Sequence, residues 1–294
     1  MKKRILAYAT LFIALVFISG CGRDEPRPAA RDADAPPRII SLTRSTTEIL
    51  FAIGAGDLVV GVSTACDQPP QVRDIRKVGD MADADMETLL ALRPDLVVST
   101  PLMVPELEPQ MERRGMEVYI APQDTLDDVL ESILEIGRRA GTEETARELV
   151  DDLRERIAAV KERADEIPEG ERPKVFIEIG HSPLYTVGRS SFLHEMITIA
   201  GGVNITADIA QPFAQISGDV VVERNPDVIL IGYMAVVDDA EKGVYGRVGW
   251  SRIPAVRNDR IIADIHPDLM FRPGPRLVDG LELIHQKLYP ERAH

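Results

Sequence analysis

Two stretches of this sequence, 132 residues apart, repeat one pattern, and this repeat constrains the fold more than any other feature. Residues 87–98 read ETLLALRPDLVV and residues 219–230 read DVVVERNPDVIL, with an acidic residue seven positions before a proline in both. Proline disfavours helix in the residue before it, so each copy predicts a short helix halted by Pro-Asp. The β-branched run that follows predicts a central parallel strand.

The repeat begins further upstream in each half. Residues 38–42 (RIISL) and 174–178 (KVFIE) are short apolar runs after a basic residue, typical of a buried strand that opens a domain. An apolar helical stretch ended by glycines follows each one, at 48–56 and 195–202. Ser45 and Glu48 have the spacing of a helix capping box. The order strand, helix, strand in both halves predicts an α/β fold with two similar lobes.

A long polar and apolar pattern separates the two halves. Residues 142–167 carry apolar side chains at Leu149, Leu153, Ile157 and Val160 among charged residues, without Pro or Gly inside the segment. This predicts one amphipathic helix. A helix of ~25 residues reaches ~38 Å, long enough to join two lobes, although it could also end a βαβ unit in the ordinary way. We therefore expect lobes at 38–141 and 169–294 and a linking helix at 142–168.

The first 37 residues predict export and anchoring. Three basic residues precede the apolar run 5–18, which is too short to span a bilayer and predicts a secretory signal peptide over residues 1–20. Ile18-Ser19-Gly20-Cys21 resembles the lipobox of bacterial lipoproteins, so we expect Cys21 to be the lipid-modified mature N-terminus on the extracytoplasmic side of a bacterial membrane. An ordinary signal peptide with a chance cysteine is the alternative. Residues 21–37 lack any hydrophobic period and are expected to form a flexible tether.

Several kinds of chemistry have no support in the sequence. The net charge of −14 argues against a nucleic-acid partner, which needs clustered Lys and Arg. Cys66 is the one cysteine left after Cys21, so no intramolecular disulfide is expected. No phosphate-binding glycine loop, Gly-x-Ser-x-Gly elbow or zinc-spaced His/Cys cluster occurs. We expect neither a cofactor, a protein-built metal site nor catalysis.

Duplicated α/β lobes place their strand-end loops around a crevice between them, where ligands bind in such sheets. The loops expected there are 43–44, 64–67, 79–81, 100–103, 181–185, 211–213, 233–234 and 266–272. Within them, His181, His266 and Cys66 are more easily explained as surface or packed residues than as ligand contacts. Trp250 is expected to pack in the second lobe's core. Asp268, Arg272 and Arg276 lie in a Pro-rich segment before the last helix and suit the polar edge of a ligand.

The acids of the repeat, Glu87 and Asp219, each lie two residues after a plausible helix cap, Asp85 or Ser217. Favourable interaction with the helix dipole alone would explain them. A functional interpretation is that one acid on each lobe forms a salt bridge with a two-fold symmetric partner.

Residues 38–42, Thr47-Glu48-Ile-Leu-Phe-Ala-Ile-Gly, Cys66-Asp-Gln-Pro-Pro70, Val78-Gly79 and Leu92-Arg-Pro-Asp-Leu-Val-Val together resemble the iron-complex and cobalamin periplasmic binding proteins. The resemblance runs from about Arg38 to Tyr289. It implies two Rossmann-like lobes bridged by a helix, little hinge motion, and delivery of a small ligand to an ATP-driven importer. A monomer is expected.

The resemblance also implies residue roles. Glu87 and Asp219 correspond to the family's glutamates that pair with arginines of the two permease subunits, although aspartate is one methylene shorter. Similarity to the cobalamin binders places Asp268 and Arg272 against the polar edge of a corrin, with Phe213, Tyr185 and Met81 near its faces. Ala65, Met81 and Thr100 stand where the best-known cobalamin binder has aromatic rings, and Asp80 follows Val78-Gly79 where haem binders usually have tyrosine.

Three functions follow as hypotheses. The first is capture of a corrinoid for an ABC permease dimer without any chemistry. The second, in the same class, is capture of haem or a ferric siderophore, whose anionic oxygens Arg44, Arg272 and Arg276 would meet. The third is an enzyme of chelatase-like fold that uses the same crevice.

Overall fold

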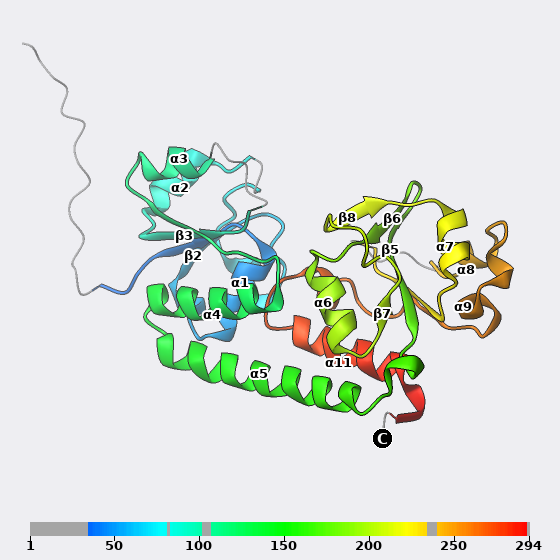
Figure 1. Cartoon of the computed structure of the whole chain (residues 1–294). Coiled ribbons are helices and arrows are strands. Elements are labelled where there is room, and N and C mark those ends of the chain that lie inside the picture. Colours follow the sequence, from blue (N-terminus) through cyan, green and yellow to red (C-terminus); the bar gives the residue numbers. More distant parts are fainter. Residues whose placement is uncertain (1–34, 81–82, 102–106, 234–239, 293–294) are drawn as a thin grey trace, which may run out of the picture. The chain divides into compact units, whose positions relative to one another are not determined.

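The repeated segments form the central strands of two sheets (Figure 1). The structure is a computed structural model that describes residues 35–80, 83–101, 107–233 and 240–292, and residues from Pro36 onward belong to one compact unit. The first sheet is parallel, in the order β2-β1-β3-β4, and contains β1 (Ile39–Ser41), β2 (Val59–Val62), β3 (Leu96–Ser99) and β4 (Glu117–Ile120).

The second sheet has six strands, in the order β10-β9-β5-β6-β8, with β7 also paired to β5. It contains β5 (Lys174–His181), β6 (Leu184–Val187), β7 (Val203–Asn204), β8 (Phe213–Gln215), β9 (Val228–Ile231) and β10 (Ile261–Ile262). We name the first sheet and its helices the N-terminal lobe and the second sheet and its helices the C-terminal lobe. This confirms the predicted α/β fold of two lobes.

The helices alternate with the strands. The N-terminal lobe contains α1 (Arg44–Ala52), α2 (Met86–Leu92), α3 (Leu107–Glu112) and α4 (Leu126–Ala140). The long helix α5 (Glu143–Asp165) follows. The C-terminal lobe contains α6 (Phe192–Ile199), α7 (Gly218–Arg224), α8 (Lys242–Tyr245), α9 (Pro254–Arg257), α10 (Asp268–Phe271), α11 (Leu277–Leu288) and the 3-10 turn η4 (Trp250–Arg252).

The two copies of the sequence repeat have the same local structure. Helices α2 and α7 each end at a residue in the left-handed conformation, Arg93 (φ 47°) and Asn225 (φ 51°). The aspartate after each proline then binds the start of the opening strand. Asp95 N donates to Arg38 O at 2.8 Å and Arg38 N donates to the Asp95 carboxylate at 2.7 Å. Asp227 and Lys174 exchange the equivalent bonds at 2.8 and 2.9 Å.

Strand pairing extends the duplication. The parallel order β2-β1-β3-β4 has its counterpart in β7-β5-β9-β10. In the C-terminal lobe the antiparallel strands β6 and β8 are additional. Because β9 occupies one edge of β5, β6 and β7 share the other edge, with β7 on Lys174–Val175 and β6 on the stretch from Glu178 to His181. The added strands therefore extend the carboxyl end of the central strand.

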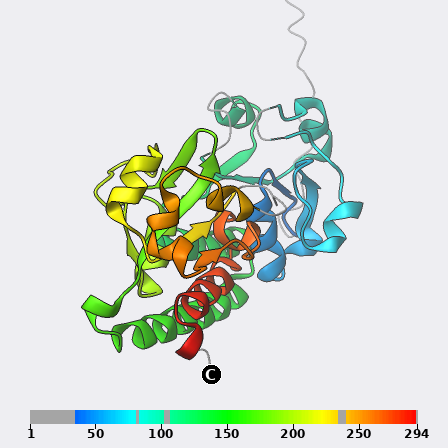
Figure 2. The same ribbon diagram turned by 90° about the vertical axis from the view of Figure 1, so that its right-hand side faces the viewer.

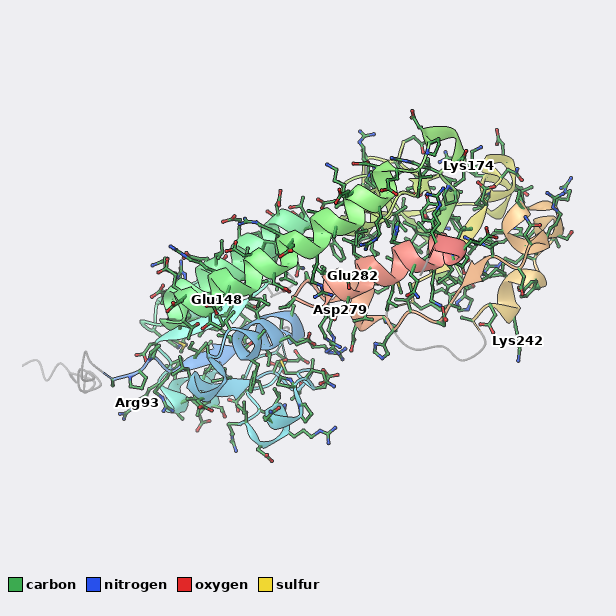
Figure 3. All side chains as sticks on the ribbon, turned by 90° about the horizontal axis from the view of Figure 1, so that it is seen from below. Arg93, Glu148, Lys174, Lys242, Asp279 and Glu282 are labelled. Carbon is green, nitrogen blue, oxygen red and sulfur yellow. The ribbon has the colours of Figure 1, made fainter. Side chains whose placement is uncertain are left out.

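Helix α5 lies within the predicted segment 142–168 and contacts both lobes. It packs against α4 of the N-terminal lobe and α11 of the C-terminal lobe (Figure 3). Arg156 of α5 binds two acids of α11, Asp279 at 2.6 Å and Glu282 at 2.7 Å. One continuous cluster of buried apolar residues runs from β1 and α1 through α4 and α5 to α6, α11 and β5. This shared core joins the lobes over a wide area.

A second apolar layer covers the opposite face of each sheet. In the N-terminal lobe α2 and α3 bury Leu89, Leu107 and Met111 against β1 and β3. In the C-terminal lobe Val221 of α7 and Trp250 of η4 pack on Phe176 and Ile229. The Trp250 and Phe176 rings meet edge to face at 6.0 Å, as predicted for a core tryptophan.

The predicted start of the first helix was wrong. The N-cap of α1 is Thr43, whose side chain accepts from Thr46 N at 3.4 Å, and not Ser45. Glu48 therefore lies in the second turn of α1, where it is buried. Instead of closing a capping box, its carboxylate binds arginines from the other lobe.

Candidate functional site

Five charged side chains meet where the two lobes contact each other, and we name them the interlobe ion cluster. Glu48 and Asp67 belong to the N-terminal lobe, and Asp268, Arg272 and Arg276 belong to the C-terminal lobe. Arg272 donates to Glu48 at 2.6 Å and to Asp67 at 3.0 Å. Arg276 donates to both oxygens of Glu48, at 2.8 and 2.7 Å. The predicted ligand residues Asp268 and Arg272 are thus brought together with two acids of the opposite lobe.

Both arginines of the cluster are paired with carboxylates. Three carboxylates surround two guanidinium groups, a net charge of −1. Arg272 is only 6 % exposed, and its Nε lies 2.8 Å from Asp268 Oδ1 without the alignment of a hydrogen bond. Partial burial disfavours the charged form of Asp67, but the guanidinium groups of Arg272 and Arg44 hold the pKa of this carboxyl below its usual 3.8. Arg272 and Arg276 are therefore both charge-paired with carboxylates of the protein itself.

Asp268 and its neighbours differ in local structure from the prediction. The sequence predicts a Pro-rich loop, but Asp268 is the first residue of the short helix α10. Asp268 and Arg272 are four residues apart, so one helical turn brings their side chains together. His266 lies 3.6 Å from Asp268 and is mostly exposed.

Arg44, near this cluster, keeps more unused hydrogen-bond donors than Arg272 or Arg276. It is exposed as the first residue of α1, and its Nε donates to Ala65 O at 2.9 Å. In the part of the chain that the structure describes, its two terminal nitrogens have no ion pair. Arg44 is therefore available to a polar ligand group, while Arg272 is not.

Tyr185 and Phe213 form an aromatic surface on the added strands. They lie in β6 and β8 and not in loops as predicted. Tyr185 pairs with Gln215 and Val187 pairs with Phe213, so the antiparallel register puts both rings on the same face of the ribbon. The residues are 39 % and 47 % exposed, which is high for aromatic side chains. Met81, the third residue predicted for this role, lies outside the described residues, as do Met103 and Met234 at the ends of two predicted loops.

Hydroxyl groups fill the carboxyl ends of β1 and β3. Ser41 contacts Thr46 at 2.7 Å, and Thr47 donates to the thiol of the buried Cys66 at 3.1 Å. Cys66 is thus a small packed residue, as predicted. The hydroxyls of Ser99 and Thr100 are buried and form no hydrogen bond with the rest of the described chain. The carboxyl ends of β1 and β3 in the N-terminal lobe are thus lined by buried hydroxyl groups.

The corresponding strand end of the C-terminal lobe holds a buried carboxylate that the sequence interpretation missed. Glu178 of β5 is fully buried and accepts two bonds from Arg247, at 2.6 and 2.7 Å, and one from Tyr233 at 2.5 Å. Burial and the Glu178 carboxylate raise the pKa of Tyr233 above its ordinary value of 10. A lone acid inside the apolar run VFIEI was the available signal, since a buried charge requires a partner.

His181 is the last residue of β5 and its ring lies 5.6 Å from that of Tyr233. Over residues 35–80, 83–101, 107–233 and 240–292, no group of His, Cys, Asp and Glu has the arrangement of a metal site.

The predicted docking acids occupy equivalent places. Glu87 and Asp219 are both exposed in the first turn of their helices, α2 and α7. The caps are those predicted: Asp85 accepts from Thr88 N at 3.0 Å and Ser217 accepts from Val220 N at 3.4 Å. Both helices lie on the side of the lobes away from α5 (Figures 1 and 2).

A hollow of about 710 Å³ lies at another place, beside the edge strand β10. Two pairs of its polar side chains bind each other: Lys287 donates to Asp264 at 2.6 Å, and Tyr245 donates to Asp259. None of the predicted ligand residues lines it.

Cys21, predicted to carry lipid, lies outside the described residues. Within the described ranges no helix combines the length and apolar character that crossing a membrane requires.

The chain is similar to known transport proteins. A family model described as periplasmic binding protein matches residues 39–268. The uncharacterized ABC transporter substrate-binding lipoprotein YvrC of Bacillus subtilis is 33 % identical over 99 % of both chains. The crystal structure of the vitamin B12-binding protein BtuF of Vibrio cholerae has a TM-score of 0.75 and 27 % identity over 88 % of this chain and 99 % of that one. The structure of the haem-binding protein RhuT of Roseiflexus sp. RS-1 in apo form has a TM-score of 0.73 and 28 % identity, over 87 % of this chain and 99 % of that one.

These similarities decide between the classes of function raised by the sequence. The matched family consists of transport proteins that bind substrates, which confirms that the chain is not an enzyme and excludes the chelatase-like alternative. The predicted resemblance is confirmed as well. The chain belongs to the periplasmic binding protein family, as a substrate-binding component of the ABC importer class.

Proposed function

We propose that this protein binds a corrinoid between its two lobes and delivers it to an ABC permease dimer. The observation that carries the proposal is the neutralised interlobe ion cluster. Arg272 and Arg276 face three carboxylates within the protein, so the polar edge presented to a ligand has no excess positive charge.

Such an edge favours a ligand rich in neutral amides over a polyanion. Bringing anionic oxygens beside a cluster of net charge −1 costs electrostatic energy. Amide groups can instead accept hydrogen bonds from the terminal nitrogens of Arg44. The similarity to a vitamin B12-binding protein agrees with this choice.

Tyr185 and Phe213 are proposed to contact the face of the macrocycle. Their shared face on β6 and β8 offers two exposed rings, which suit a broad, flat and partly apolar ligand. Met81 is proposed to contribute from the N-terminal lobe.

The remaining roles are proposed from the helices and the leader. Glu87 and Asp219, one on each lobe, are proposed to form salt bridges with cations of the two permease subunits. Cys21 is proposed to carry the lipid that holds the protein on the extracytoplasmic side of its membrane, with residues 21–37 as tether. A relative that is a lipoprotein supports this anchor.

Haem or a ferric siderophore is the second candidate. The free terminal nitrogens of Arg44 favour it, since one cation can meet a propionate or a chelating oxygen. Similarity to a haem-binding protein also supports it.

The proposal is tested by titrating the mature protein with cyanocobalamin, haemin, a ferric hydroxamate and a ferric catecholate, followed by calorimetry and absorbance. We expect cobalamin to bind most tightly and with little dependence on salt, because charge pairing contributes little. Tyr185→Ala and Phe213→Ala should each weaken binding about tenfold, which corresponds to about 1.4 kcal/mol.

Tyr245→Ala is the matched control, since Tyr245 is also an exposed tyrosine (44 %) but lies beside the β10 hollow. It should leave affinity unchanged. Tighter binding of a ferric siderophore, with steep weakening by salt, would contradict the corrinoid assignment.

A further inference from the structure

We propose that an aliphatic side chain lies beside each proposed docking acid, Leu90 on α2 in the N-terminal lobe and Val248 on the turn 246–249 next to α7 in the C-terminal lobe, and that both insert into apolar recesses of the permease subunits. This inference rests on the proposed docking role of Glu87 and Asp219. It adds an apolar anchor to each charged contact.

In the N-terminal lobe the acid and the aliphatic side chain share one face of α2. Glu87 and Leu90 are three residues apart, so they are neighbours on the helix surface. Leu89 is buried in the core, whereas Leu90 is 43 % exposed. Leu90 therefore leaves much of its apolar surface in solvent, whereas Leu89 is buried against the sheet.

In the C-terminal lobe a turn replaces the aliphatic residue of the helix. The offset of 132 places Val222 of α7 at the position of Leu90, but Val222 is half-buried. The turn 246–249 lies beside it, since a Cβ on Gly249 would be 3.9 Å from Val222 Cγ2. Val248, one residue earlier in this turn, is 97 % exposed. In the C-terminal lobe the exposed aliphatic side chain next to α7 therefore comes from the turn 246–249 and not from the helix itself.

The turn that carries Val248 is firmly held on both sides. Arg247 binds the buried Glu178 with two hydrogen bonds and stacks on the Trp250 ring at 4.4 Å. Gly249 has φ +83°, a conformation that favours glycine. Trp250 is 1 % exposed and lies under the first residue of α7, because a Cβ on Gly218 would be 3.1 Å from its Nε1. The same contacts fix Val248 and Asp219 relative to each other.

An aliphatic side chain held fully in water by a rigid turn contributes nothing to folding. Burying a valine or leucine in a partner yields about 1.5–3 kcal/mol, so each of these side chains can strengthen a contact with another molecule. That contact should also bear a cation on each side, because each aliphatic residue accompanies an acid. Two related helices on one side of the molecule fit a partner with two-fold symmetry, which a permease dimer has (Figures 1 and 2).

The test measures binding of the ligand-loaded protein to the importer of the same organism, reconstituted in nanodiscs. Leu90→Ser and Val248→Ser should each weaken binding about tenfold, and the double variant more, with ligand affinity unchanged. Val203→Ser is the matched control. Val203 is as exposed as Leu90 (43 %), but it lies in β7, at the opposite end of β5 from β6. It should bind as the parent does.

The Glu87→Ala/Asp219→Ala double variant separates the two levels of the inference. If it loses binding while Leu90→Ser/Val248→Ser binds like the parent, the aliphatic anchors are refuted and the docking acids stand. If the parent itself does not bind the importer, both ideas fail. A dimer of the free protein that dissociates in Leu90→Ser/Val248→Ser would overturn the proposal in favour of self-association.

Discussion

The two lobes share one frame but differ at the carboxyl ends of their central strands. Helices α2 and α7 have equivalent caps, equivalent left-handed ends and the same aspartate bonds to the opening strand. The carboxyl end of β1 has buried hydroxyls, whereas the carboxyl end of β5 has the carboxylate of Glu178 and the added strands β6 and β8. The frame that carries the proposed docking helices is the same in both lobes, and the strand ends around the proposed ligand site differ.

The lobes also use their buried acids differently. Glu48 of the N-terminal lobe binds arginines of the other lobe, so it joins the two lobes. Glu178 of the C-terminal lobe is satisfied by Arg247 and Tyr233 of its own lobe, so it stabilises that lobe internally. One acid thus fixes an interface and the other fixes a turn.

The largest effect is expected when Glu178 loses its charge. Glu178→Gln leaves the guanidinium of Arg247 half-buried without a counter-charge, which should lower the free energy of unfolding by about 3 kcal/mol. Urea denaturation measures this. Glu223→Gln, an exposed acid on α7, is the control and should change stability little.

A double substitution sharpens this result. Glu178→Leu with Arg247→Leu removes both charges, so it should recover much of the loss, as replacement of buried pairs by apolar residues often does. A double variant as unstable as Glu178→Gln would show that the turn, and not the pair, carries the stability.

The shared frame was predictable because its signals are local. Each copy of the repeat spans a dozen residues, and its acid-to-proline spacing and β-branched run can be read within that span. These signals predicted both proposed docking helices, their caps Asp85 and Ser217, and the strands that follow. The apolar period of 149, 153, 157 and 160 fixed α5 in the same way.

The divergent parts were not predictable, since they depend on pairs far apart in the chain. Glu48 meets Arg272 over 224 residues, and Glu178 meets Arg247 over 69. A capping-box spacing explained Glu48 locally, and nothing local contradicted it. Tyr185 and Phe213 were placed in loops because three-residue and four-residue strands are too short for a clear alternating pattern.

A smaller effect separates the two left-handed helix ends. Arg93 is exposed and has a side chain that disfavours φ > 0, whereas asparagine tolerates this conformation at Asn225 (Figure 3). Arg93→Gly should therefore raise the free energy of unfolding by about 1 kcal/mol, and Asn225→Gly should change it by a few tenths. Denaturation midpoints of the two variants give the comparison. Equal gains at both sites would mean that the two ends are not distinguished by backbone strain.

The smallest effect concerns pH and the contact between the lobes. Because Arg272 and Arg44 hold the pKa of Asp67 below 3.8, its charged form stabilises the folded state above pH 3.8, and this contribution disappears as the pH falls through the lower, folded-state pKa. Asp67 is half exposed, so the contribution is below about 1 kcal/mol. Asp67→Asn should be less stable than the parent at pH 7, and the gap should close towards pH 3, as followed by urea midpoints. Asp74→Asn, at an exposed acid of the same segment, should show no such gap. A gap for Asp67→Asn that persists unchanged to pH 3 would mean that its hydrogen-bonding shape, and not its charge, holds Arg272 against the N-terminal lobe.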